Sequence, residues 1–188
     1  MKAHRFLLLL KLCQREELDS TTMAPDRNPK RTPKKKTTIN NGEIENRTRP
    51  SSNDLHEIVF FQRHVSADIN ESTPGQDFLN EVCPVGVRRT FRAVLIAVAK
   101  APPKRFAGGG YWEAMHGDMS GWFEVRVDGP KRRHYRLFCL LDYDHPNEPK
   151  PLLVVVTGMS KLFTTQFSDA DYAKVRKLGS EYKSRRLE

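Results

Sequence analysis

The sequence is poor in cysteine and lacks any apolar run long enough to cross a membrane. Of its 188 residues only Cys13, Cys83 and Cys139 are cysteines, and none forms a Cys-x-x-Cys pair. This odd, unpaired set argues against a disulfide framework or a structural zinc site and favours buried thiols in a reducing compartment. Every apolar stretch is well short of the roughly 18 residues that span a bilayer, so no membrane association is expected.

The common signatures of nucleotide and nucleophile chemistry are also missing. The three glycines at 108–110 are not followed by Gly-Lys-Ser/Thr, which excludes a P-loop, and there is no Gly-x-Ser-x-Gly. His116, His134 and His145 lack the spacing to carboxylates that a metal site requires, and we interpret His116 and Asp118 as turn residues. The sequence therefore predicts neither a metal nor another cofactor.

Aromatic residues are almost absent from the first part of the chain, where basic residues are concentrated. The net charge is +9, and the first fifty residues hold 12 basic and 6 acidic residues but only one aromatic, Phe6. Such a composition cannot offset the entropy of ordering the chain. We therefore predict a disordered basic extension over residues 1–54 and a folded domain over 55–188. The cluster Lys34–Lys36 is either a non-specific phosphate contact or part of a solvated tail.

The extreme N-terminus has some features of a secretion signal. An apolar run at 6–10 follows Lys2 and Arg5, but Lys11 interrupts it and charged residues at 14–17 replace a small-residue cleavage site. We therefore expect a cytoplasmic protein, and Met23 is an alternative translation start.

Periodicity predicts an α+β domain. Apolar residues recur at helical spacing over 85–100, and two prolines follow at 102–103. A short strand is expected at 58–61, alternating strands at 122–127 and 134–142, and a buried apolar strand at 152–157. Residues 158–161 are expected to turn out of that strand, and a capped helix to begin at 168–171.

Two strand arginines are the strongest candidates for chemistry. Arg126 and Arg136 sit mid-strand and project from one sheet face if a hairpin joins their strands, an arrangement that suits bidentate phosphate binding. The alternative is an ion pair between Glu124 and Arg126 on a solvated face. Lys161, expected in a loop after the apolar strand, and His134, near the turn, complete a basic group with one imidazole that can act as acid or base.

Three segments together resemble a known family. They are Trp112–Arg126, His134–Phe138 and Gly158–Lys161, and they are similar in order and spacing to the RelE/ParE toxin superfamily, in particular its HigB-like, phage-derived branch. The resemblance covers roughly residues 78–183. It implies helices packed on one face of a small twisted antiparallel sheet, with a C-terminal helix.

The resemblance also implies a function, that of the toxin of a type II toxin–antitoxin system. The activity would be metal-independent cleavage of messenger RNA, often at the ribosome, by attack of the ribose 2′-hydroxyl on the adjacent phosphate. Arg126, Arg136, Lys161 and His134 would form the catalytic group, and a cognate antitoxin would be the protein partner. Further RNA contacts are expected from five basic residues, Lys104, Arg105, Lys131, Arg132 and Arg133.

The sequence departs from this family at two points. Leu162 stands where HigB-like members often have a second lysine, and Tyr172 and Tyr182 are interpreted as helix packing residues rather than as the late catalytic residue of the family. A non-catalytic binding protein of the same fold therefore stays open, either a ParE-like inhibitor of DNA gyrase or a domesticated member.

Overall fold

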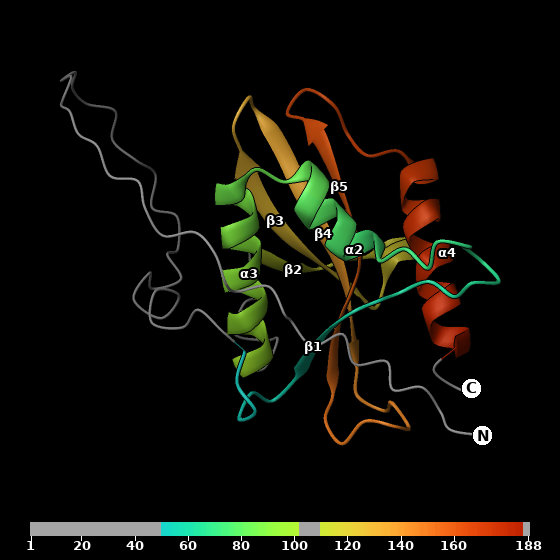
Figure 1. Ribbon diagram of the computed structural model, residues 1–188. Coiled ribbons are helices and arrows are strands. Elements are labelled where there is room, and N and C mark those ends of the chain that lie inside the picture. The colour runs from blue at the N-terminus through green and yellow to red at the C-terminus, as the bar shows by residue number, and fades with distance from the viewer. Residues whose placement is uncertain (1–49, 102–109, 186–188) are drawn as a thin grey trace. The chain divides into compact units, whose positions relative to one another are not determined.

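The computed structural model describes residues 50–101 and 110–185, which form an α+β unit around a five-stranded sheet (Figure 1). In chain order the elements are β1 (Glu57–Phe60), α2 (Pro74–Asp77), the π-helical turn η1 (Phe78–Val82), α3 (Val85–Lys100), β2 (Trp112–Ala114), the 3-10 turn η3 (Gly117–Met119), β3 (Trp122–Gly129), β4 (Arg133–Asp142), β5 (Leu152–Leu162) and α4 (Asp169–Arg185). The α+β class, the long helix α3 and the C-terminal helix are confirmed. Of the predicted N-terminal extension, residues 1–49 lie outside the described residues.

The sheet is mixed rather than antiparallel. Its strand order is β1-β5-β4-β3-β2, and β1 pairs in parallel with β5, Glu57 lying opposite Leu152 and Phe60 opposite Val155. The other three pairs are antiparallel. The expectation of a purely antiparallel sheet was wrong because a short strand early in the chain adds in parallel beside β5. Local sequence does not encode that pairing.

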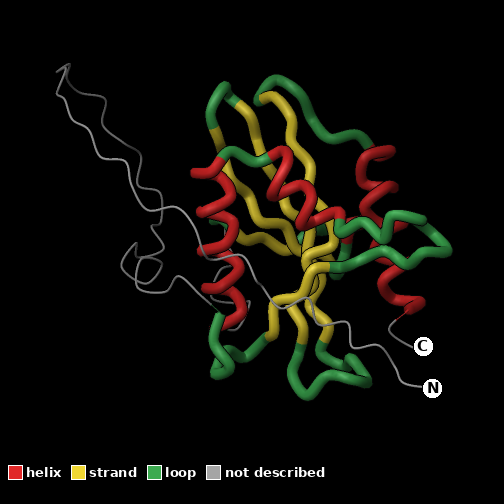
Figure 2. Tube along the Cα trace, in the orientation of Figure 1, coloured by secondary structure: helices red, strands yellow, loops and turns green. Residues whose placement is uncertain are grey.

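Helices cover both faces of the sheet, which corrects the expectation of one covered face (Figure 2). On one face α3 and η1 pack on alternate strand residues, with Phe91, Val98, Leu137 and Val155 fully buried. On the other face α4 packs through Val175 against the remaining strand residues. Because successive strand residues point to opposite faces, the continuous apolar run of β5 supplies both cores.

Strand β5 is longer than the sequence predicted. It continues to Leu162 and stays paired with β4 along its length, whereas a turn was expected from Gly158 onward. The glycine is required for packing: a Cβ atom at Gly158 would lie 2.0 Å from the Phe78 ring. Lys161 consequently lies in a strand and not in a loop.

Helix α4 begins with the predicted cap. The Ser168 backbone N–H donates to the Asp171 carboxylate at 3.0 Å, and the Asp171 N–H donates to the Ser168 hydroxyl at 3.2 Å. These reciprocal bonds satisfy two of the amides that a helix start leaves without partners. The cap therefore fixes the first turn of α4.

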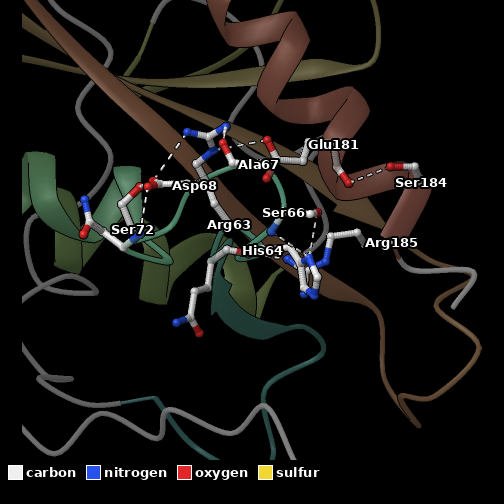
Figure 3. Close-up of polar contacts among 11 residues, drawn as sticks. Arg63, His64, Ser66, Ala67, Asp68, Ser72, Glu181, Ser184 and Arg185 are labelled. Carbon is white, nitrogen blue, oxygen red and sulfur yellow. Dashed lines mark hydrogen bonds and ion pairs between the residues drawn. The ribbon is translucent and has the colours of Figure 1, made fainter.

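A polar network fastens the segment after β1 to the last turns of α4 (Figure 3). The Arg63 guanidinium donates to Glu181 at 3.1 Å and to the Ala67 carbonyl at 2.9 Å. Arg185 donates to the carbonyl of Gln62 at 2.6 Å. Since these residues are far apart in sequence, the network holds α4 against the end of the sheet that carries β1.

Two of the three cysteines are described, and both are free and buried. Burial raises the pKa of the Cys83 thiol to about 12 and the pKa of Cys139 well above its usual range. Neither thiol is therefore a nucleophile at neutral pH. This agrees with the interpretation of the two cysteines as buried thiols. Among the described residues no helix is both long and apolar enough to cross a bilayer.

The contact between α4 and β3 gives a test of the fold. We expect Gly179→Ala to lower the free energy of unfolding by about 1–3 kcal/mol, because its Cβ atom would lie 2.3 Å from the Trp122 ring. The matched control is Gly86→Ala in α3, where nothing lies within 4 Å of a Cβ atom. At that position the higher helix propensity of alanine should raise the free energy of unfolding by up to about 1 kcal/mol. Urea unfolding of both variants measures whether each substitution lowers or raises the free energy of unfolding. Stabilisation by Gly179→Ala would contradict the packing.

A buried histidine gives a second test. His56 is 5% exposed and packs edge-to-face on Tyr143, and burial lowers its pKa from 6.5. The unfolded chain therefore binds a proton more readily, so stability should fall as pH decreases below about 6.5. His56→Phe keeps a ring in place and should reduce this loss between pH 7 and 5 in thermal unfolding. If the stability of the variant depends on pH as that of the unaltered chain does, other groups cause the loss of stability at low pH.

Candidate functional site

The register of three strands brings the four predicted catalytic residues onto one sheet face. Arg126 of β3 lies directly opposite Arg136 of β4, and His134 of β4 lies directly opposite Lys161 of β5. Directly opposed residues of antiparallel strands project from the same face, and residues two apart on one strand share a face as well. All four therefore belong to the face on which α4 packs, beyond the area that its apolar residues cover.

Carboxylates separate the two opposed arginines. Glu124 on β3 has a side chain only 6% exposed, and both Nε and Nη2 of Arg126 bind its carboxylate. The second Glu124 oxygen lies 3.7 Å from Nε of Arg136. Glu113 on β2 also pairs with Arg126. The predicted ion pair between Glu124 and Arg126 is thus confirmed, with the carboxylate of Glu124 buried and the Arg126 side chain 39% exposed.

Arg136 is held less tightly than Arg126. It is 14% exposed, its Nη1 donates to the Tyr135 carbonyl at 3.0 Å, and its nearest carboxylate oxygens are 3.7 and 3.8 Å away, on Glu124 and Asp128. Burial lowers the pKa of Arg136, and the Glu124 charge opposes this shift. Its guanidinium therefore has capacity left for another anion.

Lys161 is the cation of this face that lacks an acidic partner. Within the described ranges no carboxylate lies within 4.0 Å of its amine, which sits 4.3 Å from the centre of the Phe167 ring. Burial lowers the pKa of Lys161, and the neighbouring charge of Arg136 lowers it further. Two cations that repel each other in this way are both stabilised by a bound anion.

His134 is paired with an acid across the hairpin. Its Nδ1 lies 2.6 Å from the Asp128 carboxylate, and the imidazole is 24% exposed. A carboxylate only accepts, so Nδ1 carries a proton and Nε2 is the acceptor in the neutral ring. The same Asp128 oxygen lies 3.8 Å from Arg136, which links the imidazole to the arginines.

Tyr172, from the first turn of α4, belongs to this group although the sequence indicated only a packing role. Its ring does pack edge-to-face on Phe138 and Phe167. Burial raises its pKa, and the Glu124 charge raises it further, so its hydroxyl lies within electrostatic reach of the site. The sequence predicted where α4 starts but not which face of the sheet it covers, and that face decides which charges lie near Tyr172.

The predicted RNA-binding residues do not all lie in equivalent places. Lys104 and Arg105 lie outside the described residues. Lys131 and Arg132 are exposed at the tip of the β3–β4 hairpin, in left-handed conformations with φ of 57° and 52°. Arg133 is partly buried, and its Nη2 donates to the Ser160 hydroxyl at 3.0 Å. Arg133 is thus already engaged within the sheet.

A shallow groove of about 470 Å³ opens beside Lys161, along the part of β5 that extends beyond its pairing with β1. Phe78 and Val82 line one side, and Phe167 and Asp171 line the other. In the part of the chain described here, no group of three or more histidine, cysteine or acidic side chains is arranged to hold a metal ion.

Comparison with known proteins gives no assignment. No protein-family profile matches the chain, and the searches of curated proteins and of solved structures likewise give no significant match.

The shared carboxylate gives a test of the site geometry. We expect Glu124→Ala to lower the free energy of unfolding by about 2–3 kcal/mol, because it leaves two partly buried arginines opposed. Glu113→Ala is the control and should cost about 1 kcal/mol or less, because its pair with Arg126 is more exposed.

Adding Arg126→Met to Glu124→Ala should restore part of the lost stability, since it removes the repulsion. Urea unfolding of the set measures this coupling. Equal losses for the two glutamate variants, or no recovery in the double variant, would show that Glu124 does not hold the arginines.

Proposed function

We propose that this chain is a RelE/HigB-like toxin that cleaves messenger RNA in the cytoplasm and is neutralised by a cognate antitoxin. The observation that carries the proposal is that Arg136 and Lys161 share one sheet face and that the charge of Arg136 helps to lower the pKa of Lys161. Among the described residues, no carboxylate lies within 4.0 Å of the Lys161 amine. Such a pair stabilises a phosphate and, more strongly, the extra negative charge of a phosphorane. The resemblance of three segments to that superfamily supports the same assignment.

In this proposal the two arginines have different roles. Arg136 and Lys161 bind the non-bridging oxygens of the scissile phosphate. Arg126, which two carboxylates hold, positions Arg136 through their shared partner Glu124. This division follows from the distances, because Arg136 makes only long contacts to acids.

His134 moves the proton. Its Nε2 accepts the proton of the ribose 2′-hydroxyl as the 2′-oxygen forms a bond to phosphorus, and the bond from phosphorus to the 5′-oxygen breaks. The leaving 5′-oxygen takes a proton from water, and the products are a 2′,3′-cyclic phosphate and a 5′-hydroxyl; the imidazolium of His134 then returns its proton to the hydroxide that remains. Asp128 fixes the tautomer and stabilises the imidazolium that forms. No metal is required for these steps.

One observation favours a second candidate, a non-catalytic binding protein of the same fold. The three cations of the site are matched in number by three carboxylates, those of Glu113, Glu124 and Asp128. A charge-balanced face can persist without any phosphate ligand. On this alternative the chain inhibits DNA gyrase in the manner of ParE, or it is a domesticated protein without toxicity.

Expression in bacteria without a partner tests the proposal. We expect growth arrest, with internal breaks in messenger RNA that carry 2′,3′-cyclic phosphate and 5′-hydroxyl ends. Arg136→Ala and Lys161→Ala should each relieve the arrest and lower the cleavage rate roughly 100-fold or more, as loss of a group that stabilises transition-state charge does. The matched control is Lys174→Ala, an exposed α4 lysine whose only described acidic partner, Asp171, is 3.9 Å away; it should leave toxicity unchanged.

The outcomes separate the candidates. Arrest with a DNA-damage response and intact messenger RNA indicates a gyrase inhibitor. Harmless expression of a folded protein contradicts both toxin assignments. Breaks that persist at the same rate in Arg136→Ala and Lys161→Ala would place the chemistry elsewhere.

A further inference from the structure

An aromatic side chain with a fixed position lies exposed beside the candidate site. Phe163 follows β5 directly and is 39% exposed. Its backbone N–H donates to the Arg132 carbonyl at 2.9 Å, which ties it to the start of β4. Its position is therefore set by main-chain bonding and not by burial in a core.

The Phe163 ring stacks on the imidazole of His134. The ring centres are 4.1 Å apart and the planes are inclined by 21°. His134 is in turn held by Asp128 at 2.6 Å. We call these two stacked rings the ring platform. Because the imidazole covers only one face of Phe163, and the residue stays well exposed, the platform offers a preorganised aromatic surface.

The ring platform lies within one nucleotide of the cations of the site. Phe163 is two residues after Lys161, and His134 is two residues before Arg136. His134 and Arg136 both lie in β4, where two residues span about 6.6 Å, so a phosphate held by Arg136 and Lys161 places its own base, or the next one, at the platform. Unpaired bases stack on exposed aromatic rings in this way, whereas bases inside a duplex present no free face.

We propose that the ring platform of Phe163 and His134 binds an unpaired nucleobase by stacking, so that the site takes single-stranded RNA. This inference rests on the proposed function and specifies its substrate class. Stacking on a ring tolerates all four bases, so the platform orients the strand without setting a strict sequence preference. Phe163 is thus a positioning residue for the nucleotide next to the scissile phosphate.

A purely structural role for Phe163 is the alternative, and the choice of variants separates the two. Phe163→Leu keeps an apolar side chain over His134 but removes the stacking surface, whereas Phe163→Trp keeps it. The matched control is Tyr143→Leu, an aromatic residue 55% exposed just beyond the opposite end of β4. If Phe163 has only a structural role, the two variants should bind RNA equally well, or Phe163→Leu should bind better because it is the smaller change.

Binding is measured with a probe that cannot be cleaved by 2′-hydroxyl attack. The probe is a fluorescein-labelled 2′-O-methyl oligoribonucleotide, single-stranded or annealed to its complement, titrated with the full chain by anisotropy at about 150 mM salt. Base stacking is worth roughly 1–3 kcal/mol, so Phe163→Leu should weaken single-strand binding about 5- to 150-fold. Phe163→Trp and Tyr143→Leu should stay within about threefold of the unaltered chain. Urea unfolding checks that each variant is folded.

The results distinguish failure of the platform from failure of the proposed function. If the unaltered chain binds the probe and Phe163→Leu binds equally well, the platform is overturned while the RNA-cleaving function stands. Equal affinity for the annealed probe overturns the single-strand preference and, with it, the platform. If the unaltered chain binds neither probe and leaves RNA intact, both proposals are overturned.

Discussion

The arrangement of the site depends on one buried carboxylate. Antiparallel pairing sets Arg126 directly opposite Arg136, and like charges in that position oppose each other. Glu124, two residues from Arg126 on the same face, contacts both guanidinium groups from a side chain that is 6% exposed. Without it the register that builds the site would be electrostatically unfavourable. The site and the stability of the sheet centre are therefore linked through a single residue.

Because Arg126 is saturated by acids and Arg136 is not, the two arginines that look equivalent in sequence differ in what they can bind. The cations with capacity for an anion are Arg136 and Lys161, from neighbouring strands. The imidazole and the exposed ring of Phe163 lie on the adjoining positions. In the proposed mechanism the phosphate is bound by Arg136 and Lys161. The proton is moved by His134, and the base stacks at Phe163, which directly follows β5.

Much of the fold was predictable because it is encoded locally. The spacing of Val87, Phe91 and Val98 gave helix α3, and the pair Ser168 and Asp171 gave the start of α4. What sequence did not reveal depends on distant contacts. Gly158 was interpreted as a turn because glycine usually weakens a strand. In the structure the Phe78 ring occupies the space that a Cβ atom at position 158 would need.

The site shows the same division between local and distant information. Strand alternation was sufficient to put Arg126 and Arg136 on one face. It could not supply Glu113, because the strand β2 that carries this residue was not expected, nor the coupling of Tyr172, which depends on which sheet face α4 covers. The amphipathic pattern of a helix indicates which residues are buried but not the surface that buries them.

The pairing of β1 with β5 has a consequence for the order in which the chain acquires its structure. Glu57 and Leu152 are partners across the middle of the sequence, so closing this pair carries a large loop-closure cost. During synthesis β1 is made early and stays without its strand partner until β5 has left the ribosome. The β3–β4 hairpin, with both arginines, is local and can form before that. Lys161 joins them only when β5 docks, so the basic group of the candidate site comes together only at that step.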